Sequence, residues 1–187
     1  MSLIDDLYQP LADHDLRLVP ITEAHREGLR AACAEDTEIW EMYPLSFIGE
    51  RFDASFASLM NPEGRLAYAI TLKGAIVGMT AWHDFSAPKS TTHIGNSYIA
   101  PRLRGTGLNQ RIKKLMIDHA VAAGFRRVGF MVDARNTRSQ RAVEKIGGVR
   151  EGVLRAERVT WTGYVRDTVM FSILADEWFS RSDQANG

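Results

Sequence analysis

The sequence predicts an α/β protein that is built on one mixed sheet and flanked by helices. Segments with helical and strand periodicity alternate along its 187 residues, and 45% of the residues are hydrophobic, which is enough for the core of one domain over residues 1–187. The strand expected at 127–132 follows a long helix. Because a helical crossover usually joins parallel strands, we expect this strand to be parallel to the strand before the helix.

The first half of the chain is expected to hold a strand, three helical segments and a hairpin. Residues 15–21 alternate weakly in hydrophobicity and predict a strand, and Thr22 with His25 forms an imperfect capping signal before a helix at 24–34. Lys73-Gly74 is a two-residue hairpin signal between two strands. The other elements expected in this half are short helices at 35–43 and 52–60 and the two hairpin strands at 65–72 and 75–84.

The second half has clearer patterns. One apolar stripe predicts a helix at 105–124, and Gly124 ends this helix as a C-cap. Strands are expected at 91–100 and 127–132, a helix at 136–146 before Gly147-Gly148, and two further strands at 149–159 and 164–174. The last strand is a candidate sheet edge that would pair two copies of the chain in a homodimer.

Composition narrows the class of protein. No window holds the run of about 18 apolar residues that a membrane span needs, and the N-terminus is acidic, unlike a signal peptide. Cys33 is the single cysteine, so it cannot form an internal disulfide, and the histidines show no metal-ligand spacing. We therefore expect a cytoplasmic protein with neither a membrane partner nor a metal.

Opposite charges are segregated along the chain. Residues 1–84 hold 14 acidic and 6 basic side chains, whereas residues 85–143 hold 11 basic and 2 acidic ones. The basic segment suits a polyanionic ligand and the acidic segment suits a cationic partner, although solvated helix faces would show the same counts. A nucleic-acid partner is not expected, because aromatic residues do not alternate with the basic ones.

A glycine-containing loop joins the strand at 91–100 to the long helix. The loop reads Arg102-Leu103-Arg104-Gly105-Thr106-Gly107-Leu108, and no acidic residue lies near the start of the helix. Free amides at a helix N-terminus favour an anion, above all a phosphate, and glycines allow the close approach. The loop lacks the Gly-Lys-Ser/Thr end of a P-loop and the third glycine of a dinucleotide fingerprint.

Arg-x-x-Gly-x-Gly before a helix, then a strand, then a helix led by Asn136, resembles the Gcn5-related N-acetyltransferase (GNAT) superfamily. The blocks RGTGLN, DARNTRSQRAVEKIGGVREGVLR and GYVRDTVMFSI are similar to the ribosomal-protein N-terminal (Rim-type) acetyltransferase branch, over a core of about residues 15–180. The resemblance implies a mostly antiparallel sheet whose parallel central pair splays for acyl-CoA. It also implies transfer of an acetyl group from acetyl-CoA to an amine by direct attack on the thioester.

The resemblance also implies which residues bind the cosubstrate. Backbone amides of the loop should hold the pyrophosphate, with Arg102 and Arg104 beside it, and the end of the preceding strand should pair with the pantetheine arm. Asn136 and Ser139 should face this arm near the sulfur. The residues expected at acetyl-CoA are Tyr98, Ile99, Ala100, Arg102, Arg104, Gly105, Thr106, Gly107, Leu108, Asn109, Asn136 and Ser139.

Acetyl transfer also needs a proton acceptor for the amine and a proton donor for the thiolate. Many superfamily members carry a tyrosine seven residues after the helix-opening asparagine, where this chain has Val143. Ser139 is therefore the candidate donor, although it could serve only as a hydrogen-bond partner of the pantetheine. His93 stands where related sequences often have glutamate, and an imidazole can act as a base at neutral pH. Glu151 is the alternative base, or the partner of an arginine.

The amine acceptor is not identified by the sequence, because similar folds acetylate different amines. Trp40, Tyr43 and Trp82 are candidates for lining its pocket, with burial in the core as the alternative. The acidic first segment favours a cationic amine, and the Rim-type resemblance favours a protein N-terminus. A catalytically silent acyl-CoA-binding sensor is the alternative function, since the usual glutamate and tyrosine are absent.

Overall fold

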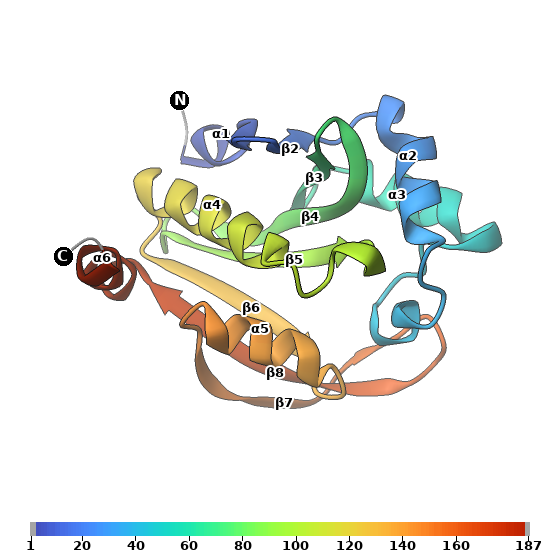
Figure 1. The fold of residues 1–187 in the computed structure, drawn as a ribbon. Helices are drawn as coiled ribbons and strands as arrows, with labels where there is room; N and C mark the ends of the chain where they lie inside the picture. The colour runs from blue at the N-terminus through green and yellow to red at the C-terminus, as the bar shows by residue number, and fades with distance from the viewer. Residues whose placement is uncertain (1–2, 186–187) are drawn as a thin grey trace.

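The computed structural model describes residues 3–185, which form one eight-stranded sheet (Figure 1). In spatial order the strands are β1 (Leu11–Asp13), β2 (Leu16–Pro20), β3 (Arg65–Leu72), β4 (Ala75–Ser86), β5 (Thr91–Ile99), β6 (Arg127–Asp133), β8 (Val165–Leu174) and β7 (Val149–Val159). Neighbouring strands are antiparallel except for β5 and β6, which are parallel. The expected α/β fold class, with one mixed, mostly antiparallel sheet, is confirmed.

Helices cover both faces of the sheet. On one face α1 (Leu3–Leu7) and α4 (Leu108–Ala122) pack into a core that includes Leu7, Ile112, Met116 and Ile94, with α5 (Thr137–Lys145) beside them (Figure 1). On the other face α2 (Arg26–Cys33) and α3 (Phe52–Met60) pack into a second core. Short 3-10 turns lie at Glu23–His25, Ile39–Met42, Gly49–Arg51 and Pro101–Leu103, and α6 (Ala175–Ala185) follows β8.

The parallel pair is short and then separates. Its register comprises Thr91 with Arg127, Thr92 with Val128 and His93 with Gly129, and no later residues of β5 and β6 are paired with each other in the described part of the chain. The ladder between β4 and β5 is also irregular beside Asn96, whose φ is +49°. Because a bulge bends its strand, this irregularity turns β5 away from β6 and leaves a gap in the middle of the sheet.

Most elements lie close to their expected ranges, because their apolar patterns are long and regular. The sequence did not predict α1, β1 or α6, and the segment expected as a helix at 35–43 forms only a 3-10 turn at Ile39–Met42. The last strand was expected at a sheet edge, but it lies between β6 and β7, so that β7 is the edge. Alternate residues Val169, Phe171 and Ile173 of β8 are buried in the core, which favours the inner position.

None of the helices within residues 3–185 combines the length and the apolar character that crossing a bilayer requires.

Candidate active site

Two cavities meet at the gap between β5 and β6. The first, of about 270 Å³, extends across the sheet to β3, β4, β7 and β8, and we call it the strand cavity. The second, of about 240 Å³, extends to the loop before α4, and we call it the loop cavity. They share the lining residues Tyr43, Ser97, Asn109, Ser139 and Ala142. Two ligands that enter from different sides can therefore meet at this gap.

The loop cavity ends at the N-terminus of α4. Gly105 and Gly107 have φ angles of +79° and +86°, which non-glycine residues rarely adopt, and Gly107 caps the helix. The space where a Cβ of either glycine would lie is open. The first N–H groups of a helix have no acceptor within it, and the first turn of α4 holds no acidic residue. This end of α4 is therefore suited to bind an anion such as a phosphate.

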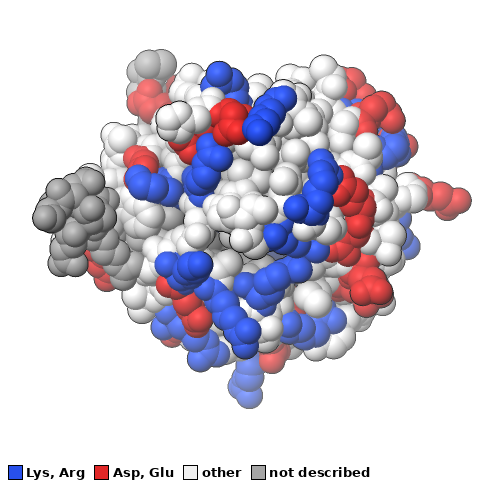
Figure 2. Space-filling model, viewed as in Figure 1, with Lys and Arg blue, Asp and Glu red and all other residues white. Residues whose placement is uncertain are grey.

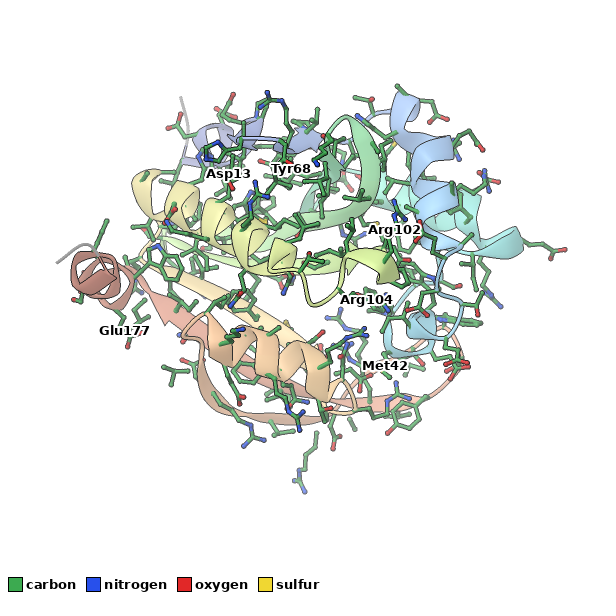
Figure 3. All side chains as sticks on the ribbon, viewed as in Figure 1. Asp13, Met42, Tyr68, Arg102, Arg104 and Glu177 are labelled. Atoms are coloured by element: carbon green, nitrogen blue, oxygen red, sulfur yellow. The ribbon has the colours of Figure 1, made fainter. Side chains whose placement is uncertain are left out.

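The expected loop arginines are committed to acidic partners. Arg104 Nη1 donates a hydrogen bond to Asp36 Oδ2 (2.5 Å) and its Nε donates to Ile99 O (3.2 Å), while Arg102 forms an ion pair with Glu35. Figure 3 labels both arginines where the loop meets the segment after α2. Their charge is therefore partly neutralised before any ligand binds.

The segregation of charge along the sequence has a structural explanation. Arg102, Arg104 and Arg111 of the basic segment pair with Glu35, Asp36, Asp13 and Asp15 of the acidic segment. On the opposite wall of the loop cavity, Arg138 and Lys145 of α5 add positive charge. Figure 2 shows Lys and Arg side chains around the hollow in the middle of this face, with acidic side chains gathered beside α2.

Not every residue expected at the cosubstrate is available to it. Tyr98 and Ile99 line the loop cavity, but Ala100 is buried and its N–H donates to Val77 O (2.9 Å), so this amide is not free for a pantetheine arm. Asn136 is buried and caps α5, since its Oδ1 accepts a hydrogen bond from Ser139 N (3.0 Å). Thr106 and Leu108 do not line the loop cavity, whereas Asn109 lines both cavities within the described residues.

Ser139 lies where the two cavities join. It is partly exposed, and it belongs to the first turn of α5, which begins after the end of β6. The Asn136 cap fixes the backbone of this turn and therefore the direction of the Ser139 side chain. The position is compatible with contact to the sulfur end of a ligand that enters from the loop cavity.

A buried lysine was not expected from the sequence. Lys113 of α4 is only 5% exposed and lines the strand cavity, where its Nζ donates to Ser97 Oγ (2.5 Å). Ser97 Oγ in turn lies 2.9 Å from Thr80 Oγ1, and Ser97 O accepts a hydrogen bond from Tyr43 OH (2.5 Å). Burial lowers the pKa of Lys113 to about 7, so a large share of this side chain is neutral at pH 7.

His93 lies in the last residue pair before β5 and β6 separate. Its ring lies over Gly129 of β6, where a Cβ would come within 1.9 Å of His93 Cδ2, so a larger residue at this position would displace the His93 ring. His93 Nδ1 is 3.4 Å from Asp84 Oδ2, which also lies 2.8 Å from His83 Nδ1. Burial, together with the charge of His83, lowers the pKa of His93, so its imidazole is neutral at pH 7.

The ligand atoms of His83, Asp84 and His93 lie within 4.8 Å of one another, which makes them the one group in residues 3–185 that could hold a metal ion. Asp84 already interacts with His83, and this contact lowers the pKa of Asp84 to about 2. The positive charge of Arg158 acts on the same carboxylate. A nearby guanidinium opposes the binding of a cation, so we assign no metal to this group.

Glu151 is poorly suited to accept a proton. It binds Arg127 through both carboxylate oxygens and accepts a hydrogen bond from Ser172 Oγ (2.8 Å). The hydrogen bonds from Arg127 lower its pKa to about 2. Glu151 also lines neither cavity among the described residues, and the same holds for His93, whose neighbours His83 and Asp84 line the strand cavity. Of the two roles that the sequence allowed for Glu151, the structure therefore shows the pairing with an arginine.

The three aromatic candidates for the acceptor pocket differ in their exposure to the cavities. Tyr43 lines both cavities. Trp40 and Trp82 have no exposed surface, and each lies in one of the two cores. Their expected place in the acceptor pocket is therefore corrected to the core, because a fully buried indole offers no surface to a substrate.

Comparison with known proteins places this chain in a family. Residues 15–149 match the model of the acetyltransferase (GNAT) domain. The chain is similar to a protein of Chromobacterium violaceum assigned to the GNAT family, with 26% identity over 92% of this chain and 89% of that one and a TM-score of 0.84. It is also similar to a protein of T. thermophilus assigned as an acetyltransferase, with 29% identity over 92% of each chain and a TM-score of 0.83.

The fold is also similar to that of Mycobacterium smegmatis RimJ in complex with CoA-disulfide. The identity is 20% over 90% of this chain and 87% of that one, with a TM-score of 0.75. No curated protein matches the sequence.

Proposed function

The chain belongs to the GNAT acetyltransferase family, and we propose that it transfers the acetyl group of acetyl-CoA to the nitrogen of an amine acceptor. The observation that carries this proposal is the meeting of two cavities at the gap between β5 and β6. One cavity starts at a helix N-terminus suited to phosphates, and the other opens on a different part of the sheet. Such a gap holds two reactants together, which is the main requirement of a transfer between them.

Acetyl-CoA is proposed to enter through the loop cavity. The amides at the start of α4 bind its pyrophosphate, and Arg138 and Lys145 add positive charge. Its pantetheine arm follows Tyr98 and Ile99 towards Ser97 and brings the thioester to the gap. The CoA ligand of the similarly folded RimJ supports this placement.

The amine is proposed to enter through the strand cavity and to attack the thioester carbonyl carbon directly. A C–N bond forms and the C–S bond breaks, while the amine loses one proton and the thiolate gains one. His93 lies behind His83 and Asp84, which line the strand cavity, so its neutral imidazole accepts the amine proton through a bridging water, and Asp84 stabilises the imidazolium that results. Glu151 has no part in this proposal, because a carboxylate whose pKa is about 2 is too weak a base.

On the thiolate side, Lys113 is proposed to donate the proton. The pKa of Lys113 is about 7, below the value of about 8.5 for an ordinary thiol, so the transfer of a proton to a thiolate is favourable. Ser139 is then assigned the second of its two expected roles, as a hydrogen-bond partner of the pantetheine near the sulfur.

A thiol-release assay tests the function. Purified protein with acetyl-CoA is offered amino acids, amino acid amides, peptides with free N-termini and polyamines, and free thiol is followed over time. Amine-dependent thiol release, with the acetylated amine identified by mass spectrometry, supports the proposal. Thermal stabilisation by acetyl-CoA without thiol release for any amine would instead favour the sensor function.

A further inference from the structure

The strand cavity is lined by three arginines, which come from three different strands. Arg65 belongs to β3, Arg158 to β7 and Arg166 to β8. Burial lowers the pKa of both other guanidinium groups and the charge of Arg158 adds to this effect, so the three cations share one region of the cavity. None of them is among the residues that line the loop cavity. They therefore belong to the side from which the amine is proposed to enter.

Two of these arginines form no ion pair in the described part of the chain, although the charge of Asp84 acts on Arg65 and that of Asp133 on Arg166. Arg65 Nη1 is buried and has no hydrogen-bond partner within residues 3–185. Arg166 is only 4% exposed and donates to two neutral oxygens, Thr168 Oγ1 (3.1 Å) and Met42 O (3.4 Å). In the described part of the chain neither arginine forms an ion pair, whereas Arg158 is bound to Glu157. A buried guanidinium that is not hydrogen-bonded to a carboxylate is costly, and a bound anion would reduce this cost.

The acidic residues that line the same cavity are already committed. Asp133 is paired with Arg135, and Asp84 interacts with His83 and His93. The cavity therefore has unpaired positive charge and offers no free carboxylate to a cationic ligand. The acidic first segment, from which a cationic acceptor was expected, forms ion pairs with other arginines instead.

The sheet register connects this charge to the proposed base. Arg65 is the direct neighbour of His83 on β4, and His83 is the direct neighbour of His93 on β5. Adjacent strands are about 4.8 Å apart, so two strand spacings separate Arg65 from His93. The long side chain of Arg65 can therefore hold one end of a small molecule in the strand cavity while the other end lies at His83, the cavity-lining neighbour of His93.

We propose that the amine acceptor carries an anionic group, a carboxylate or a phosphate, and that Arg65 and Arg166 bind this group in the strand cavity. Acceptors of this class are free α-amino acids and amino phosphates. Guanidinium groups bind both anions through paired hydrogen bonds, which also fix the orientation of the ligand. This inference rests on the proposed acetyl transfer and specifies its substrate class.

Matched acceptor pairs test the inference. Each pair has the same amine with and without the anion: an α-amino acid and its amide for the carboxylate, and phosphoethanolamine and ethanolamine for the phosphate. We expect kcat/KM to be at least tenfold higher for the anionic member of one pair, and the pair that shows it identifies the anion. Spermidine, a purely cationic amine, should be a poor acceptor.

The variant Arg65→Gln should reduce this preference at least tenfold, and Arg65→Lys, which keeps the charge but loses the paired hydrogen bonds, should reduce it less. Comparing the preference between variants cancels the intrinsic difference in reactivity between the two amines. Arg150→Gln removes an exposed arginine of β7 that does not line the strand cavity, and it should leave the preference unchanged. If Arg65→Gln fails to fold, Arg65→Lys alone tests whether the preference depends on Arg65.

The outcomes of these assays distinguish a failure of the anionic-acceptor inference from a failure of the proposed acetyl transfer. A preference for amides or spermidine, or an unchanged preference in both folded Arg65 variants, would overturn the anionic acceptor while leaving acetyl transfer in place. If no amine is acetylated by the wild-type protein, the proposed function is wrong and the inference fails with it.

Discussion

Burial acts on two titratable side chains beside the gap, and in both it disfavours the charged form. Lys113 is surrounded by α4, β4 and β5 with hydroxyl groups as its polar neighbours, and its pKa falls to about 7. His93 lies beside Asp84, His83, Arg127 and Glu151, and its pKa also falls. Groups that exchange protons near neutral pH are more useful in catalysis than in a stable core.

At the residue scale, we predict that Lys113→Met lowers the activity of the protein but raises its stability. Loss of the proton donor should lower kcat by roughly 10²-fold with little change in the Kd for acetyl-CoA. Methionine fills a similar volume without a polar group to desolvate, so the variant should be more stable by roughly 1–3 kcal/mol at pH 7. Steady-state kinetics and thermal melts measure both effects.

Neighbouring variants control this prediction. Lys114→Met removes an exposed lysine that pairs with Asp118, and it should change neither kcat nor stability strongly. Ser139→Ala should weaken acetyl-CoA binding while kcat stays within a few-fold of the wild-type value. If kcat falls in Ser139→Ala and holds in Lys113→Met, the serine is the proton donor, as the sequence first predicted.

The same two groups predict a bell-shaped pH profile of kcat. His93 must be neutral to accept a proton, and its lowered pKa places the rising limb below about 6.5, the ordinary value for histidine. Lys113 must be protonated to donate, so the rate should fall as pH rises through about 7. His93→Gln should remove the acidic limb and Lys113→Met the alkaline limb in pH–rate measurements. An acidic limb that survives in an active His93→Gln variant would assign the base to another group.

At the element scale, the function of α4 depends on its first turn. Gly107 caps the helix at a φ of +86° with open space beside it, where the pyrophosphate is proposed to bind. Gly107→Val should therefore weaken CoA binding at least tenfold, about 1.4 kcal/mol, in isothermal titration. Gly74→Val is the matched control, because Gly74 has a φ of +82° and open space in the β3–β4 hairpin. Equal CoA affinity in the two folded variants would contradict the phosphate assignment.

The elements differ in how well the sequence predicted them. The apolar stripe of α4, the alternation of β6 and the glycines that follow α4 and α5 gave ranges close to those observed, because these patterns depend on local geometry. The three-residue β1 has too few residues for a pattern, and it forms only through its pairing with β2. The inner position of β8 depends on contacts between distant segments, which a local pattern does not contain.

The site was predicted in the same uneven way. The loop glycines and Ser139, which line the cavities, were selected through their motif, whereas Lys113 was missed because a lysine beside an apolar stripe usually indicates a solvated face. Its burial follows from the position of the first turns of α4 over the gap, which is a tertiary feature. The cavity arginines were missed because Arg65, Arg158 and Arg166 lie far apart in the sequence and meet only through the strand order.

At the scale of the whole molecule, the sheet consists of two parts that share one hydrophobic core but are joined by little strand pairing. β1 to β5 form one part and β6, β8 and β7 the other, and three residue pairs between β5 and β6 connect their backbones within the described chain. A ligand in the gap contacts both parts, since both cavities are lined by β5 or α4 on one side and by α5 on the other. Bound acetyl-CoA should therefore stabilise the junction between the two parts of the sheet at β5 and β6.

We predict that acetyl-CoA at about 100 times its Kd stabilises the fold by about 2.7 kcal/mol, which corresponds to a rise in Tm of roughly 5–10 °C for a chain of this size. Hydrogen exchange should slow at the facing edges of both β5 and β6, because the bound arm limits the separation of the two parts. Adenosine 3′,5′-bisphosphate, which lacks the pantetheine arm, should protect the loop before α4 but not β6. Protection of β6 by the bisphosphate alone would mean that β5 and β6 are held together without a ligand in the gap. The proposed path of the pantetheine arm would then be wrong.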